Sequence, residues 1–514
     1  MTASAGARPP GSLAFRVLPP LVVALFALRV ALATLPGLWI DEVFSLQHAL
    51  GPLSGIWGEG WRLESSPPLY YFTLWVWVRL VGDGEVAARM LSVLLTVVST
   101  LLVRRAAVTL AGREAGWIAT ACWLLPALAV EYSVEIRPYA LVGVLVAAAT
   151  AALARALVDH RTGRIVDARG TARAVAPIVL AAAAMFYAHT TTFSVIAGLA
   201  AAAAFHGWRT RASAGYARAW AAGCAATAVL CLPQLVFALG VIASNRAGLA
   251  WIPSSFDPHY VSWVLREWVI GQVAWPAVAS VPVAVGVFAA IAAAAAKVRD
   301  RVEVIAVGAV LPAVGAFALW IAGVNQAILM HRTLLWTWIP VAVLLGCAAV
   351  RLGRRPLLAA GAVALAISAS TTATWIARHD LQRPWHAALR ELEAKVRPGD
   401  RLLLLDPEVG CLVARYAGPA VREAPRVRLR LPTHPPPDTG QRIALGCNEL
   451  PEVGLADVGS ASPAGDWLLT GDDRQRRDAR ARVAELSDRL VEDDAVSIGP
   501  FLLALRVSAS RSPR

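Results

Sequence analysis

The feature that most constrains this chain is a series of apolar runs, each close to 20 residues long. About 20 apolar residues carry a helix across a bilayer, and a helix satisfies its own backbone hydrogen bonds there. With 514 residues, 57% of them hydrophobic, the sequence predicts an α-helical polytopic membrane protein. We expect about eleven spans, at residues 17–36, 86–105, 114–130, 138–157, 174–190, 191–206, 219–240, 276–297, 302–323, 332–350 and 356–375.

The formal net charge of +13 belongs to the membrane part of the chain. Before residue 376 there are 27 basic and 15 acidic residues, whereas the rest of the chain has 21 and 20. The basic excess lies in short loops between apolar runs, where it sets membrane orientation rather than binding nucleic acid. We therefore expect no nucleic-acid partner and a cytoplasmic N-terminus, with an uncleaved first span. The many alanines and arginines favour a bacterial protein in the inner (cell) membrane.

Residues 67–82 decide the topology, because they are apolar but short, aromatic and interrupted by Arg79. As a span, they would place the basic cluster at 161–173 outside the cytoplasm. As an interfacial or re-entrant helix, they leave that cluster inside, in agreement with the other basic loops. We adopt the second interpretation, so residues 37–85 form a first outer loop. Residues 1–375 then form a membrane domain, and the tail lies outside the cytoplasm.

The sequence pattern of the tail, residues 376–514, predicts a small extracytoplasmic α/β domain. Helical spacing covers 384–397, a turn precedes a strand at 401–405, and a second helix near 474–491 and a strand near 496–508 follow a proline-rich loop at 432–438. Outside the cytoplasm a disulfide between Cys411 and Cys447 is possible, but its formation stays open.

Two adjacent acids, Asp41 and Glu42, follow the first apolar run. One interpretation is that they cap a helix that begins near Val43, since acids suit a helix N-terminus. The other is catalytic, because a carboxylate at a membrane edge loses hydration and is usually retained for a partner or substrate. We favour the catalytic interpretation.

The surrounding sequence resembles a known family. It reads Leu-Trp-Ile-Asp-Glu-Val-Phe-Ser-Leu from Leu38, then Ser-Pro-Pro-Leu-Tyr-Tyr from Ser66, then Gly-Asp-Gly-Glu-Val-Ala-Ala-Arg from Gly82. This order is similar to that of the GT-C superfamily of membrane glycosyltransferases, in the branch of protein O-mannosyltransferases and lipid A aminoarabinose transferase. The resemblance implies a GT-C-like fold and a functional Asp41. Many members have His where this chain has Ser66, so a role of that histidine is lost or has moved to His48 or His189.

Further elements extend the resemblance. Glu135-Ile136-Arg137-Pro138-Tyr139-Ala140-Leu141 is similar to an Arg-x-Tyr-Ala-Leu element, and His331-Arg332-Thr333-Leu334-Leu335 to an Arg-Tyr-Leu-Leu segment. Considered alone, Arg137 is typical of an arginine at the membrane interface. Considered together with a functional Asp41, Arg137 and Arg332 are expected to bind the phosphate of a donor. His189 lies at a predicted span junction and alone reads as a local hydrogen-bonding group. Weaker candidates for substrate binding are His189, Tyr139, His331 and His48.

The predicted function follows from this topology. Outside the cytoplasm nucleotide sugars are absent, so we expect a polyprenyl-phosphate sugar as donor. The acceptor is a lipid, a polysaccharide or a protein. Asp41 acts as general base, Glu42 orients Asp41 or the acceptor, and the reaction inverts the anomeric centre. We expect no cofactor and no metal. The alternatives are a transporter or lipid flippase and a non-catalytic scaffold of the same fold.

Overall fold

The computed structural model describes residues 13–57, 67–165, 167–244, 257–271, 276–326, 328–352, 354–377, 385–404, 409–430, 452–454, 466–469, 490–498 and 501–509. The chain divides into two compact units. The helical unit comprises Met1–Thr34, Ser65–Thr73 and Val86–Trp375, and the mixed unit comprises Leu35–Glu64, Leu74–Glu85 and Ile376–Arg514. The tail therefore groups with most of the first loop.

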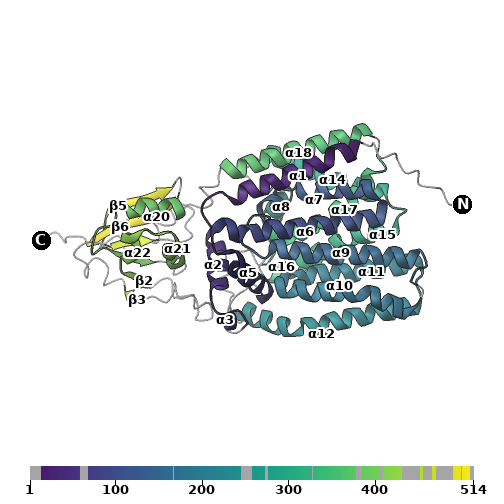
Figure 1. Ribbon diagram of the computed structural model, residues 1–514, viewed down its shortest axis with the longest axis horizontal. Coiled ribbons are helices and arrows are strands. Elements are labelled where there is room, and N and C mark those ends of the chain that lie inside the picture. The colour runs from purple at the N-terminus through teal and green to yellow at the C-terminus, as the bar shows by residue number, and fades with distance from the viewer. Residues whose placement is uncertain are drawn as a thin grey trace. The chain divides into compact units, whose positions relative to one another are not determined.

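The helical unit is built largely from long apolar helices (Figure 1). Its elements are α1 (Leu13–Ala33), α6 (Glu85–Ala111), α7 (Arg113–Leu124), α8 (Ala127–Glu131), α9 (Tyr139–Arg161), α10 (Ala168–Ala188), η1 (Thr190–Thr192), α11 (Phe193–Thr210), α12 (Ala214–Ser244), α13 (Pro258–Ile270), α14 (Ala277–Lys297), α15 (Val302–Ile305), the π-helical η2 (Ala306–Val310), α16 (Leu311–Gln326), η3 (Arg332–Thr337), α17 (Trp338–Ala349) and α18 (Arg354–Ala377).

Small residues allow these helices to pack closely. α10 packs against α9 and α12, α17 against α7, and α11 against α16. At Gly198 of α11, an added Cβ would lie 2.4 Å from the carbonyl oxygen of Leu311, and at Gly346 of α17 it would lie 2.6 Å from that of Ala115. Such contacts are typical of membrane helices, where small residues let backbones approach each other.

The predicted membrane fold is confirmed. Among the described residues, nine helices are long and apolar enough to cross a membrane. The other two expected spans fall on α7 and α18. α7 ends at Leu124 because Pro126 interrupts the helix, whereas α18 has 24 residues and covers the whole of the span predicted at 356–375. The helix predicted not to span, α5 (Pro68–Val81), has only 14 residues.

The mixed unit combines the helices of the first loop with the α/β tail. The first loop contributes α2 (Ile40–Leu50), α3 (Leu53–Trp57) and part of α5. The tail contributes the helices α20 (Trp385–Glu393), α21 (Val409–Tyr416) and α22 (Pro419–Glu423). Its strands are β1 (Arg401–Leu404), β2 (Arg426–Arg430), β3 (Glu452–Gly454), β4 (Asp466–Leu469), β5 (Leu490–Ile498) and β6 (Phe501–Ala509). The strands form one sheet in the order β3-β2-β1-β4-β6-β5. β1 pairs parallel with β2 and with β4, and β2 pairs parallel with β3, while β6 pairs antiparallel with β4 and β5.

The tail differs from expectation at its end. The single strand predicted near 496–508 is wrong, since β5 and β6 form an antiparallel pair there. The sequence Gly499-Pro500 favours a turn between them. Of the helix predicted near 474–491, residues 490 and 491 belong to β5, and the rest lies outside the described residues, as does the loop at 432–438.

Buried charges organise the sheet of the mixed unit. Arg401 pairs with Asp466 at 2.8 Å, and Arg506 pairs with Asp400 at 3.2 Å; both carboxylates are fully buried. The indole of Trp467 also donates to Asp400, at 3.1 Å. Each acid is thus compensated by charge and hydrogen bonds, as burial requires. Cys411 in α21 is disulfide-bonded, and Cys447 lies outside the described residues.

Candidate functional site

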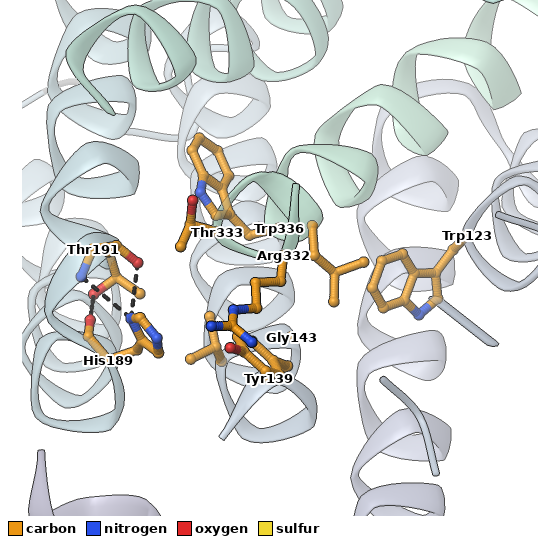
Figure 2. A pocket seen from close by; sticks show the side chains of 11 residues that line it. Trp123, Tyr139, Gly143, His189, Thr191, Arg332, Thr333 and Trp336 are labelled. Carbon is orange, nitrogen blue, oxygen red and sulfur yellow. Dashed lines mark hydrogen bonds between the residues drawn. The ribbon is translucent and has the colours of Figure 1, made fainter. Parts of the chain in front are cut away.

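The helical unit contains a cavity of about 350 Å³, counting the space at its mouth (Figure 2). Aromatic and aliphatic side chains form much of its wall, with one arginine, one histidine and several threonines among them. The lining residues are Trp123, Tyr139, Val142, Gly143, His189, Thr191, Thr192, Arg332, Thr333, Leu335 and Trp336. An apolar hollow with a few convergent polar groups is the usual form of a small-ligand site.

Three predicted site residues line this cavity: Tyr139, His189 and Arg332. They come from the start of α9, the end of α10 and the start of η3. In Figure 2 the side chain of Arg332 extends toward Tyr139. The ring centroids of Tyr139 and His189 are 5.8 Å apart. The sequence elements around these residues, nearly 200 positions apart, therefore meet in one place.

A fourth predicted residue, Arg137, is not among the lining residues but interacts electrostatically with His189, which lines the cavity. Both Arg137 and Arg332 lie within electrostatic range of the His189 imidazole. Arg137 is half-buried, in the segment between α8 and α9. Two guanidinium groups thus lie near one cavity, and guanidinium is suited to phosphate because it donates two parallel hydrogen bonds.

Local hydrogen bonds fix His189 at the junction of α10 and α11. Its Nδ1 accepts from the Thr191 backbone N–H at 3.4 Å and lies 2.8 Å from Thr191 Oγ1, while Thr192 Oγ1 donates to the His189 carbonyl at 2.7 Å (Figure 2). Because Nδ1 accepts a hydrogen bond, Nε2 carries the proton in the neutral ring.

His331 contacts aromatic partners beside the cavity. Its Nε2 lies 3.3 Å from the hydroxyl of Tyr132, and its ring meets Trp263 edge-on at 5.5 Å. Burial and the positive charge of Arg332 lower the pKa of His331 to about 3, so the imidazole is neutral. Its predicted role in substrate binding stays a prediction.

Tyr132 was not predicted from the sequence. It lies within electrostatic range of Glu131, Glu135 and Arg332, and its ring packs edge-on against Tyr139 at 4.6 Å. Trp123, Thr191, Thr333 and Trp336 were also missed. The run of three threonines after His189 was the one visible signal, since hydroxyl side chains at a span junction indicate a polar site.

The acid pair lies in the mixed unit, at the start of α2. α2 begins at Ile40, so the helix expected near Val43 starts three residues earlier. Glu42 is fully buried, and its Oε2 accepts a hydrogen bond from the Trp39 N–H at 3.2 Å. Glu42 thus caps the helix, whereas Asp41 is half-buried. His48 lies in the last turn of α2, and burial lowers its pKa to about 4.

A second hollow of about 270 Å³, counting the space at its mouth, lies elsewhere in the helical unit. It is lined by Ala127, Val130, Glu131, Ile270, Gly271, Thr371, Thr372 and Trp375. The buried hydroxyl of Thr372 has no hydrogen-bond partner among the residues that the structure describes.

Comparisons with known proteins identify the fold of the chain. Two crystal structures of ArnT, a lipid A aminoarabinose transferase, from Cupriavidus metallidurans align with nearly the whole chain. The apo structure aligns with a TM-score of 0.57 at 13% identity, over 95% of this chain and 97% of ArnT. The structure bound to undecaprenyl phosphate aligns with a TM-score of 0.60 at 13% identity, over 96% and 97%. The predicted GT-C fold is therefore confirmed. No protein-family model matches the sequence, and no curated protein matches it.

Proposed function

We propose that the chain is an integral-membrane glycosyltransferase. It takes a sugar from a polyprenyl-phosphate donor and transfers it, with inversion, to a lipid, polysaccharide or protein acceptor on the extracytoplasmic side of a bacterial inner membrane. The fold shared with ArnT, which was crystallised with undecaprenyl phosphate, supports this class of reaction.

The observation that carries the proposal is the cavity of the helical unit beside two arginines. Arg332 lines it, and Arg137 acts on its His189. A polyprenyl-phosphate sugar has an anionic phosphate beside a long apolar chain, and this cavity joins guanidinium groups to aromatic and aliphatic walls. The phosphate gains negative charge as it leaves, so fixed guanidinium groups in a poorly hydrated site stabilise the transition state.

Asp41 is the proposed general base. It accepts a proton from the acceptor hydroxyl or amine as that group attacks the anomeric carbon and the lipid phosphate departs. Glu42 orients this acid, because its hydrogen bond to Trp39 fixes the first turn of α2. A disulfide at Cys411 fits an extracytoplasmic tail, since such bonds persist in oxidising compartments.

The experiment uses the full chain in lipid with radiolabelled polyprenyl-phosphate sugars and measures release of polyprenyl phosphate. We expect release from one donor in the wild type and its loss in Asp41→Asn. The matched control is Asp300→Asn, because Asp300 is an exposed acid paired with Arg351. This control should retain wild-type turnover.

Two outcomes decide against the proposal. If folded wild type releases polyprenyl phosphate from no donor, or if Asp41→Asn is as active as the control, the transferase reaction with Asp41 as base is refuted. Lipid movement or partner binding that survives Asp41→Asn would then favour a flippase or a scaffold.

A further inference from the structure

The segment before α2 is held by side chains at three successive backbone N–H groups. The Gly37 N–H donates to Glu85 Oε2 at 2.9 Å, the Leu38 N–H to Tyr416 Oη at 2.7 Å, and the Trp39 N–H to Glu42 Oε2 at 3.2 Å. Only the third partner belongs to α2 itself. The other two partners come from residues 48 and 378 positions away.

These bonds matter because the segment turns sharply just before the acid pair. Gly37 has φ of 89°, in the left-handed region that glycine adopts without strain. Backbone N–H groups ahead of a helix have no carbonyl partner within it, so they need side chains or water. Here side chains satisfy all three, which fixes the direction in which α2 starts.

Tyr416 and Glu85 also bind each other, which closes the network. The phenol of Tyr416 hydrogen-bonds the Glu85 carboxylate while it accepts from Leu38. Burial and the negative charge of Glu85 raise the pKa of the Tyr416 phenol, so it keeps the proton that it donates. The Tyr416 ring is held in turn by edge-on packing against His386 at 5.3 Å.

A separate contact connects the same tail helix to the chain just before Glu85. Arg415, the neighbour of Tyr416 in α21, donates to the Asp83 carbonyl at 2.9 Å. This contact does not involve residues 37–39. Docking of α21 on this segment and direct support of the segment before α2 can therefore be separated by mutation.

We propose that Tyr416 and Glu85 are positioning residues for the reaction. They hold residues 37 and 38, and so fix the start of α2 and the aim of the Asp41 carboxylate. The tail domain thereby contributes to the catalytic geometry. The inference rests on the proposed function in assigning a reaction to Asp41, but the hydrogen-bond network is independent of that assignment.

The test compares Tyr416→Phe with Arg415→Ala in the full chain. Tyr416→Phe keeps the packed ring and removes the hydroxyl, so we expect faster amide hydrogen exchange in residues 36–44 and about a tenfold lower kcat for polyprenyl-phosphate release. The KM for the donor should change by less than about twofold, since the donor cavity is untouched. A tenfold loss corresponds to about 1.4 kcal/mol, typical of one hydrogen bond.

Two further variants sharpen the test. Glu85→Gln keeps one acceptor oxygen at this position, so it should retain more of kcat than Glu85→Ala, which should resemble Tyr416→Phe. Arg415→Ala should leave both exchange in residues 36–44 and kcat near wild type.

The proposal is overturned if Tyr416→Phe changes neither exchange nor kcat, or if Arg415→Ala reproduces both changes. If wild type shows no turnover with any donor, the proposed function fails, while the exchange comparison still decides whether Tyr416 positions residues 37 and 38.

Discussion

The hydroxyl of Tyr132 lies 3.3 Å from Nε2 of His331, across 199 residues of sequence. This contact joins the segment that carries Arg137 to the turn that carries Arg332. The two arginines proposed to bind phosphate are thus connected through neighbouring side chains rather than held separately.

Loss of this connection should weaken donor binding. In Tyr132→Phe we expect the KM for a polyprenyl-phosphate sugar to rise about fivefold, since one buried hydrogen bond contributes about 1 kcal/mol. Tyr216→Phe is the matched control, because Tyr216 hydrogen-bonds Ala203 and packs on His160, at the opposite end of α9 from Tyr139. Equal KM values in the two variants would contradict the role of Tyr132.

Arg29 should stabilise the helical unit through the end of α7. Its fully buried guanidinium donates to the Leu124 carbonyl at 2.7 Å, just before Pro126 ends the regular hydrogen bonding. Arg29→Ala leaves that carbonyl without this donor, so we expect a loss of about 1 to 3 kcal/mol, seen as a lower melting temperature in detergent. The exposed Arg16 on the same helix serves as control, and Arg16→Ala should melt like wild type.

Gly315 should be intolerant of a methyl group. An added Cβ would lie 2.4 Å from the Trp336 ring and 2.8 Å from the Ser194 carbonyl oxygen. Gly315→Ala must displace Trp336, a wall of the cavity, so we expect about 1 to 3 kcal/mol of destabilisation and weaker donor binding. In Gly286→Ala the added methyl group meets no atom of the described residues within 4 Å, so it should change neither melting nor binding. Similar behaviour of both variants would refute the packing argument.

Glu267 should make stability depend on pH. Burial raises its pKa to about 7, although Arg266 opposes the shift. Since an unfolded glutamate has a pKa near 4.3, the folded state binds more protons between these values, and stability falls as pH rises through them. At pH 8 we expect Glu267→Gln to stabilise the folded state by roughly 1 to 3 kcal/mol, seen as a higher melting temperature. At pH 4 the substitution should have little effect.

The control for this prediction is Glu423→Gln, at an exposed position. Its difference from wild type should be the same at both pH values. A Glu267→Gln effect equally large at pH 4 would indicate lost packing rather than proton linkage.

Hydropathy and charge were sufficient to predict the membrane fold, but not its interruptions. The hydropathy of residues 114–130, taken as an average, does not register Pro126. The apolar run was therefore predicted as one span, whereas the structure has two short helices there, α7 and α8. Pro126 itself was the signal, because proline removes a helix hydrogen bond. At the other end of the chain, the pair Gly499-Pro500 was the sequence signal against a single strand.

The site was predictable where a local sequence element resembles one in a known family. Tyr139 and Arg332 were found through such elements and His189 through its place at a span junction, and the structure brings all three to one cavity. Trp123 and Trp336 were not, because an aromatic residue in an apolar run looks like any other core residue until its neighbours in space are known. No local pattern indicated that Tyr416 would bind Leu38.

That last contact sets an order of events during biosynthesis. Leu38 leaves the ribosome first, and Tyr416 follows 378 residues later. At about 5 to 20 residues per second, this interval lasts roughly 20 to 75 s. A nascent chain that ends before α21 lacks the partner of the Leu38 N–H. The start of α2 reaches its final arrangement only once the tail has been made, so a truncated product would enter the membrane with its acid pair incompletely fixed.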